Sequence, residues 1–242
     1  IAVAAIKQGA YDFIEKPFTP ERLLDSVRRA MDKRRLVCEN RQLREQFARK
    51  GRIESQLLGV SRAMDNLRRQ VLELAGTDVN VLIRGETGSG KEQVARCLHD
   101  FSPRAGGPFV ALNAAGITPE RMEIELFGTE TPPGVERKVG AFEQAHGGVL
   151  YLDEVGDMPR ETQNKILRVL TEQTFERVGG TKRVKVDVRI ISSTSQNLES
   201  LMAEGAFRED LFHRLAVVPI AVPPLSERRA DIPMLIEAFM QQ

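Results

Sequence analysis

The sequence predicts an α/β fold in which helices cover both faces of a parallel central sheet. Short apolar segments alternate with amphipathic helical segments over most of the chain, as in strand–helix–strand units. A glycine-rich loop joins one apolar segment directly to a helical segment, and another apolar segment ends in two adjacent carboxylates. Open parallel sheets place such loops and carboxylates at one edge, so these observations predict a three-layer sandwich.

The composition of the 242 residues is that of a folded protein and excludes several classes. Hydrophobic residues make up 41% and charged residues 29%, and the net charge of +1 gives no global attraction to nucleic acid or membranes. The two cysteines, Cys38 and Cys97, form no CxxC motif, which fits a reducing cytoplasm and argues against disulfides or zinc. No apolar run reaches the length of a membrane span. The chain opens without Met and stops at Gln242 within a helical pattern, so we expect a fragment of a longer protein.

A long helix is expected near the N-terminus. Residues 1–8 resemble the end of a helix and residues 11–14 a short strand, and Pro20 then favours the first turn of the long helix. Its apolar residues have heptad-like spacing, with the polar Asn40 at one seam position. They are Leu24, Val27, Met31, Leu36, Leu43 and Phe47. The stripe fits either a coiled-coil dimer or a solvated helix that packs on a neighbouring domain. The run of residues 49–52, Arg-Lys-Gly-Arg, predicts a break and a linker.

The remaining elements alternate between helix and strand. An amphipathic helix is expected at 61–75, with apolar residues repeating along one face. Strands are expected at 80–84, 109–112, 149–152, 188–192 and 217–220, and helices at 92–101, 119–127, 160–171 and 207–215. Segments 175–178 and 183–186 flank two glycines, which predicts a β-hairpin inserted before a central strand.

The glycine-rich loop predicts a phosphate-binding site of the P-loop NTPase type, and hence ATP or a close relative as ligand. Its residues, Gly85, Glu86, Thr87, Gly88, Ser89, Gly90 and Lys91, fit G-x-x-x-x-G-K. The glycines let backbone N–H groups point at phosphate oxygens, the helix that follows adds its positive dipole end, and Lys91 reaches the terminal phosphates. Glu92 stands where many such loops carry the Ser or Thr that binds Mg²⁺.

The carboxylates Asp153 and Glu154 are the expected second half of the site. The apolar segment 149–152 delivers them at the edge where the phosphate loop lies. Asp153 is positioned to hold Mg²⁺, directly or through water, and Glu154 to polarise an attacking water. The alternative is a surface turn that happens to contain two acids.

With both nucleotide motifs in place, residues 51–242 resemble the AAA+ ATPase domain of the NtrC family of bacterial response regulators. The matching stretches lie at 85–92 (GETGSGKE), 125–128 (ELFG), 142–148 (FEQAHGG), 152–154 (LDE), 163–170 (QNKILRVL), 207–211 (FREDL) and 222–225 (VPPL). Glu92 is usual in that family. Residues 1–30 similarly resemble the end of a receiver domain, with Lys16-Pro17 matching the receiver lysine. The resemblance implies a receiver end at 1–30, a linker helix at 31–52, the AAA+ domain at 53–225 and the start of a helical lid at 226–242.

The resemblance also implies roles for four further residues. Asn113 matches the asparagine that restrains the catalytic glutamate, here Glu154. Arg208 and Arg214 match the arginines that are presented to the nucleotide of a neighbouring subunit, which requires a ring of subunits; surface salt bridges are the alternative role. Ser195 occupies the sensor I position, where the family usually has asparagine, so we expect it to orient the attacking water poorly and hydrolysis to be slow.

The segment after Gly128 departs from the family pattern. Members that remodel the sigma-54 RNA polymerase carry a GAFTGA loop there, whereas residues 129–142 read TETPPGVERKVGAF. The triplet Gly140-Ala141-Phe142 aligns with the helix that follows the loop. The shortened segment and Ser195 together resemble the NtrX branch of the family. Contact with sigma-54 polymerase is therefore not expected.

Three functions follow from these comparisons of motifs. The first is an ATP-binding central domain of a cytoplasmic two-component transcription regulator, phosphorylated by a cognate sensor histidine kinase and bound to DNA through a C-terminal module outside this chain. Its oligomeric state would depend on nucleotide and receiver phosphorylation. The alternatives are an active sigma-54-dependent ATPase and a nucleotide-sensing scaffold with little turnover.

Overall fold

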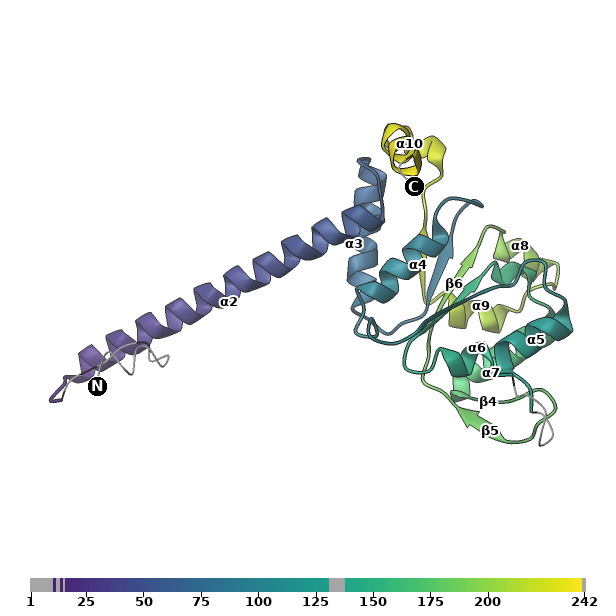
Figure 1. Ribbon diagram of the computed structural model, residues 1–242, viewed down its shortest axis with the longest axis horizontal. Coiled ribbons are helices and arrows are strands. Elements are labelled where there is room, and N and C mark those ends of the chain that lie inside the picture. Colours follow the sequence, from purple (N-terminus) through teal and green to yellow (C-terminus); the bar gives the residue numbers. More distant parts are fainter. Residues whose placement is uncertain (1–10, 12–13, 15, 131–137, 241–242) are drawn as a thin grey trace. The chain divides into compact units, whose positions relative to one another are not determined.

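The computed structural model describes the chain except residues 1–10, 12–13, 15, 131–137 and 241–242, and also leaves the side chains of residues 41–48 and 50 undescribed. The chain divides into two compact units, residues 1–52 and 53–242, and each is described by itself (Figure 1). None of the helices in the described residues combines the length and the hydropathy that crossing a bilayer requires.

The first unit consists mainly of helix α2, Pro20–Gln56, whose last residues belong to the second unit. The helix continues through Gly51, so the predicted break at residues 49–52 is wrong. A glycine inside a helix costs only about 1 kcal/mol, and the flanking Arg and Lys residues are good helix formers. The expected helix at 1–8 lies outside the described residues, and Tyr11 and Ile14, the described ends of the expected strand, have no strand structure.

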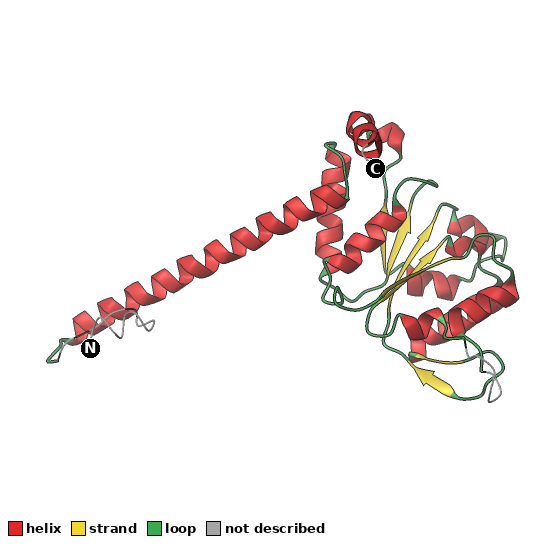
Figure 2. Ribbon diagram, in the orientation of Figure 1, coloured by secondary structure: helices red, strands yellow, loops and turns green. Residues whose placement is uncertain are grey.

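A five-stranded parallel sheet forms the centre of the second unit, as predicted. The strands are β1 (Val81–Arg84), β2 (Phe109–Asn113), β3 (Val149–Asp153), β6 (Arg189–Thr194) and β7 (Val218–Ala221). Their order is β2-β3-β6-β1-β7, and every pair is parallel. The strands are yellow in Figure 2. Because β1, β3 and β6 are adjacent, the ends of these three strands lie next to one another at one edge.

Helices cover both faces of the sheet, which confirms the three-layer architecture. Alternating residues of β1 face opposite layers: Val81 and Ile83 belong to one core, and Leu82 to the other. The first core also contains residues of α3 (Arg62–Ala75) and α4 (Lys91–Asp100). The second contains residues of α5 (Pro119–Phe127), α6 (Ala141–Gln144), α7 (Arg160–Glu172), α8 (Leu198–Ala203) and α9 (Glu209–Leu215).

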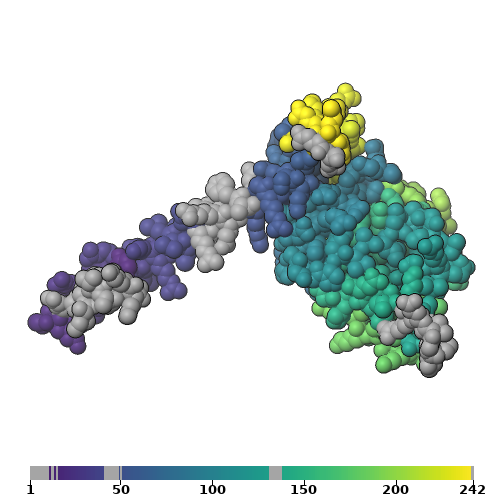
Figure 3. Space-filling view, in the orientation of Figure 1, coloured from purple at the N-terminus to yellow at the C-terminus, as the bar shows by residue number. Residues whose placement is uncertain are grey.

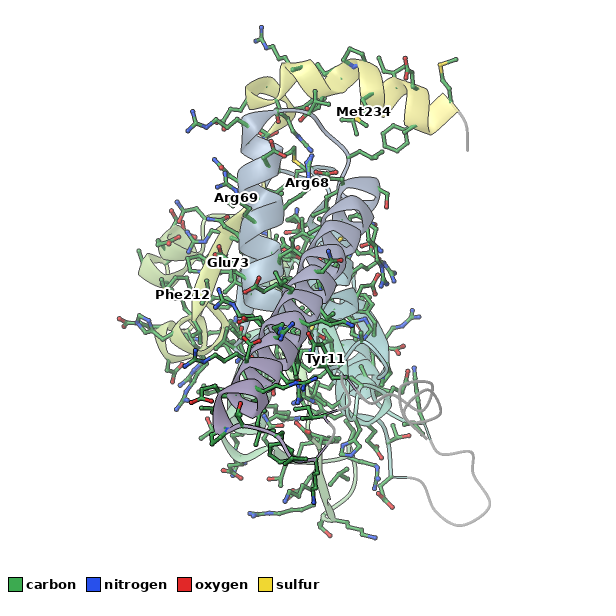
Figure 4. The ribbon with its side chains drawn as sticks, turned by 90° about the vertical axis from the view of Figure 1, so that its left-hand side faces the viewer. Tyr11, Arg68, Arg69, Glu73, Phe212 and Met234 are labelled. Atoms are coloured by element: carbon green, nitrogen blue, oxygen red, sulfur yellow. The ribbon has the colours of Figure 1, made fainter. Side chains whose placement is uncertain are left out.

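Smaller elements complete the second unit. The predicted hairpin is present as β4 (Thr174–Glu176) paired antiparallel with β5 (Arg183–Lys185). Short 3₁₀ turns occupy η1 (Val155–Asp157), η2 (Leu225–Glu227) and η3 (Arg229–Asp231). The C-terminal helix α10 (Ile232–Met240), yellow in Figure 3, exposes apolar side chains that include Met234, labelled in Figure 4. The sequence did not predict the short α8.

The turn before α3 is fixed by buried charges. The Asp231 carboxylate, fully buried, accepts hydrogen bonds from the N–H groups of Val60 (2.6 Å) and Ser61 (2.7 Å) and from the Ser61 hydroxyl (2.7 Å). Arg68, labelled in Figure 4, donates from α3 to the carbonyl of Gly59. Gly59 has φ +144°, and a Cβ there would lie 2.7 Å from Asp231 Oδ2, so only glycine fits this position.

Candidate nucleotide site

The ends of β1, β3 and β6 border a cavity of about 470 Å³. A volume of this order is typical of sites for small molecules and cofactors. Both predicted nucleotide motifs contribute to its lining. The lining residues are Thr87, Gly88, Gly90, Lys91, Glu92, Asn113, Ala115, Asp153, Glu154, Asp157 and Ser195. The structure therefore gathers most of the sequence-predicted site residues in one place.

The phosphate loop joins β1 to α4 and is shaped by its glycines. Gly88 and Gly90 have φ values of +77° and +101°, in the left-handed region that side chains disfavour. The loop closes on itself through a hydrogen bond from the Ser89 N–H to the Glu86 carbonyl at 3.1 Å. Gly90 is the N-cap of α4, so the unpaired N–H groups of the first helical turn lie beside the loop. This arrangement favours an anion such as a phosphate.

Lys91 is buried, and oxygen atoms surround its ammonium group. Lys91 Nζ donates to the carbonyls of Gly85 (3.0 Å) and Glu86 (3.2 Å) and lies 3.0 Å from Glu154 Oε1. A buried ammonium needs such partners, because desolvation without compensation is costly. These three oxygens hold the Lys91 ammonium group beside the loop, where a phosphate oxygen can replace one of the three.

Asp153 is held by two hydroxyl groups that sequence reasoning missed. The Tyr151 hydroxyl donates to Asp153 Oδ1 at 2.9 Å and lies 2.8 Å from the Ser193 hydroxyl, which also donates to Oδ1. Burial, with the nearby Asp153 charge, raises the pKa of Tyr151, so the phenol stays protonated and donates. A tyrosine within the buried strand β3 needs a polar partner, and that requirement was the available signal.

Glu154 has a strained backbone and a restrained carboxylate. Its φ of +54° is unusual for a residue with a side chain. Glu154 Oε2 accepts hydrogen bonds from the N–H (2.8 Å) and the hydroxyl (2.9 Å) of Ser195, while Oε1 faces Lys91. Burial alone would raise the pKa of Glu154, but the Ser195 donors and Lys91 outweigh it and lower the pKa. The carboxylate is therefore charged at neutral pH, with a contact on each oxygen.

Asn113 reaches the cavity but does not contact Glu154. Its side-chain oxygen accepts a hydrogen bond from the Ala115 N–H at 2.8 Å, as in an Asx turn at the end of a strand. The expected restraint of Glu154 by Asn113 is thus not made in this structure. Ser195 and Lys91 provide the restraint instead.

Glu92 and Asp153 are two further acids that line the cavity. Glu92 is engaged by Arg96, at 2.6 Å in an i,i+4 pair on α4. Asp153 has both of its hydroxyl contacts on Oδ1, and Oδ2 has no hydrogen bond to a described residue. Mg²⁺ commonly takes one or two carboxylates together with phosphates and water, so the donor set fits such an ion with Asp153 as the protein ligand.

Arg208, the N-cap of α9, and Arg214, within α9, do not line the cavity. Arg208 Nε donates to Asp210 Oδ1 at 2.9 Å, and this pairing raises the pKa of Arg208 and lowers that of Asp210. Arg214 is exposed, and its guanidinium has no hydrogen bond or ion pair to a described residue. Neither arginine therefore serves the nucleotide site of its own chain in this structure.

Residues 57–221 match the family described as Sigma-54 interaction domain. The chain is 56% identical to the nitrogen assimilation regulatory protein NtrX of Azorhizobium caulinodans over 239 residues, covering 99% of this chain and 52% of that protein. It is 47% identical to the DNA-binding transcriptional regulator NtrC of Escherichia coli K12, covering 99% and 51%. The chain thus spans about half the length of the curated relatives it matches.

Solved structures of NtrX proteins are also similar to this chain. NtrX from Brucella abortus superposes with a TM-score of 0.74 at 62% identity, covering 99% of this chain and 52% of that one. Its complex with ATP gives a TM-score of 0.73 at 60% identity, covering 100% and 51%. The similarity to both structures covers nearly the whole of this chain. The chain therefore belongs to the Sigma-54 interaction domain family, the AAA+ domain that it shares with the NtrX and NtrC regulators.

Proposed function

We propose that this chain binds ATP with Mg²⁺ and is the central domain of a two-component transcriptional regulator. The observation that carries the proposal is the cavity in which Lys91, Asp153 and Glu154 meet beside the glycine-rich loop. The ATP and ADP complexes of Brucella NtrX, which is about 60% identical, support the choice of an adenine nucleotide.

The residues divide the chemistry between them. Loop N–H groups and Lys91 bind the phosphates, and Asp153 holds the metal, which neutralises phosphate charge when bound. Glu154 accepts the proton of an attacking water once the Glu154 carboxylate has separated from Ser195 and Lys91. Because three donors must be released first, we propose that hydrolysis is slow and that nucleotide chiefly controls oligomeric state.

Calorimetry with ATP and Mg²⁺, followed by single-turnover hydrolysis at saturating protein, tests this proposal. We expect binding with a measurable but slow turnover, and loss of turnover with retained binding in Glu154→Gln. Absence of ATP binding would overturn the proposal, and an undiminished rate in Glu154→Gln would overturn the role of Glu154.

We further propose that Arg208 and Arg214 act on the nucleotide of a neighbouring subunit in a ring. Both arginines lie outside their own cavity, and a guanidinium is suited to developing phosphate charge. Mixing Arg208→Ala protein with Lys91→Ala protein tests this. The first variant keeps an intact nucleotide site, and the second keeps the Arg208 that a neighbouring site needs. Hydrolysis should recover in the mixture above either variant alone, and equal inactivity would exclude action between subunits.

Helix α2 is proposed to link this domain to a receiver and to hold two chains together. Its Leu24, Val27, Met31 and Leu36 are 46–67% exposed, which leaves an apolar stripe available to a second copy. We propose a cytoplasmic protein with a sensor histidine kinase as upstream partner and a DNA-binding module outside this chain, as expected from the relatives' description as regulators. Two-component partners of this kind act on the receiver rather than on the nucleotide site.

Remodelling of sigma-54 polymerase is the second candidate, because the matching family carries that name. The segment that would make the contact lacks the GAFTGA sequence, and residues 131–137 lie outside the described part of the chain. A sigma-54-dependent transcription assay with full-length protein decides between the two. Robust open-complex formation would replace our proposal with the remodelling function.

A further inference from the structure

One buried glutamine joins two segments that the proposed function uses at different nucleotide sites. Gln163 lies on α7 and is fully buried. Its Nε2 donates to the carbonyls of Met158 (2.8 Å) and Ala206 (3.0 Å), and its Oε1 accepts from the Arg208 N–H (2.9 Å). Both hydrogens of the amide are therefore used, on two different loops.

The hydrogen bond from Gln163 to the Met158 carbonyl reaches the turn that follows the chain's own nucleotide site. The turn η1 follows Glu154 directly, and the Asp157 N–H donates to the Glu154 carbonyl at 3.1 Å. The Met158 N–H then donates to the Val155 carbonyl at 3.2 Å. Met158 thus closes a tight turn that begins at the proposed base, and two successive turn hydrogen bonds connect its backbone to that of Glu154 and Val155.

The hydrogen bond from the Arg208 N–H to Gln163 reaches the proposed interface with a neighbouring subunit. Arg208 is the N-cap of α9, and its N–H has Gln163 as its hydrogen-bond partner among the described residues. The preceding Phe207 is 2% exposed, so this segment is anchored in the core on one side and by Gln163 on the other. The Gln163 amide therefore holds the backbone of Arg208, and the Arg208 side chain that starts there pairs with Asp210.

We propose that Gln163 is a positioning residue that transmits the state of the chain's own nucleotide site to Arg208. The inference rests on the proposed function, in which Arg208 acts on a neighbouring subunit. The amide is planar, and leaving any of its buried partners unpaired is costly. A displacement of the Met158 carbonyl must therefore carry the Arg208 backbone with it.

Hydrogen exchange at the Arg208 amide tests the link in full-length protein, with and without ATP and Mg²⁺. In Gln163→Met, which keeps the length but none of the hydrogen bonds, we expect this amide to exchange at least tenfold faster than in the wild type. ATP should change the exchange rate of this amide in the wild type and leave it unchanged in the variant. Calorimetry should give the same ATP affinity for both, since Gln163 does not line the cavity.

Two further variants keep the test decisive. Gln144→Met is the matched control, because Gln144 is exposed and its side-chain amide donates to the Val139 carbonyl at 2.9 Å, away from Arg208; the variant should exchange within twofold of the wild type at Arg208. Gln163→Asn keeps the amide but is one methylene shorter, so it should also lose the ATP response even if Gln163→Met fails to fold. An ATP response at Arg208 that survives in either folded Gln163 variant overturns the proposal. Failure of wild-type protein to bind ATP overturns the proposed function, and this inference with it.

Discussion

Ser195 donates two hydrogen bonds, from its backbone N–H and its hydroxyl, to the same oxygen of Glu154, at 2.8 and 2.9 Å. With Lys91 at 3.0 Å from the other oxygen, three donors contact the proposed base, and both of its carboxylate oxygens are occupied in part. The residue at the sensor I position thus restrains the base, a role that the sequence suggested for Asn113.

Replacing Ser195 by the residue usual in the family should accelerate hydrolysis. Ser195→Asn keeps the backbone N–H but exchanges the hydroxyl for a longer amide, which can accept a hydrogen bond from the attacking water. Ser195 is exposed, so the larger side chain has room. We expect single-turnover hydrolysis to rise about tenfold, equivalent to roughly 1.4 kcal/mol of barrier.

The control for this variant is Ser195→Ala, which removes the hydroxyl and adds no water-orienting group. Its rate should lie between those of the wild type and Ser195→Asn, because one of the three donors on Glu154 is lost and no group that orients water is gained. A rate for Ser195→Asn at or below that of the wild type would show that the sensor I position does not limit turnover.

Removal of the Lys91 ammonium should abolish ATP binding. In Lys91→Ala the phosphate loop loses its buried cation, and Glu154 Oε1 loses the positive charge that neutralises the carboxylate. We expect the affinity measured by calorimetry to fall at least ~100-fold, about 3 kcal/mol. Lys185→Ala, an exposed lysine on β5, should bind as the wild type does. Unchanged affinity in Lys91→Ala would mean that the nucleotide binds elsewhere.

The sequence predicted the parts of this fold that depend on local pattern. Alternating apolar and amphipathic segments specified the five strands, and the glycine loop with its flanking strand and helix specified the cradle. The break at Gly51 was wrong because a single glycine is a small penalty in a 37-residue helix. The contacts of Ser195 with Glu154 and of Gln163 with Arg208 could not be predicted, because these partners are 41 and 45 residues apart in the sequence and depend on strand register and loop path.

Charge placed on the stripe of α2 should dissociate a dimer held through this helix. Met31 is 67% exposed and Leu24 56%, so neither contributes to the core of the chain. Met31→Glu combined with Leu24→Glu would place like charges in the seam of a coiled coil, which destabilises it. We expect the mass from light scattering to halve, with ATP affinity unchanged. An unchanged mass would favour the alternative, in which the stripe packs on a neighbouring domain.

Asp231 should contribute to stability in a way that depends on pH. Burial opposes its charge, but the donors of Ser61 and Val60 and the Arg228 charge outweigh burial and lower the pKa of Asp231 below its ordinary 3.8. A carboxyl group whose pKa is lowered by folding stabilises the protein fully above its unfolded pKa. That contribution is lost as the pH falls below 3.8 through the folded pKa.

Asp231→Asn should therefore lower the free energy of unfolding by about 2 kcal/mol at pH 7, because hydrogen bonds to a charged acceptor become bonds to a neutral one. Urea denaturation of both proteins at pH 7 and pH 3 measures the effect, and the difference between them should shrink at pH 3. Asp65→Asn, an exposed acid in the first turn of α3, should change stability by no more than ~0.5 kcal/mol. A difference for Asp231→Asn that stays constant down to pH 3 would show that geometry rather than charge makes Asp231 stabilising. The turn at Gly59 would then be held by hydrogen bonding alone.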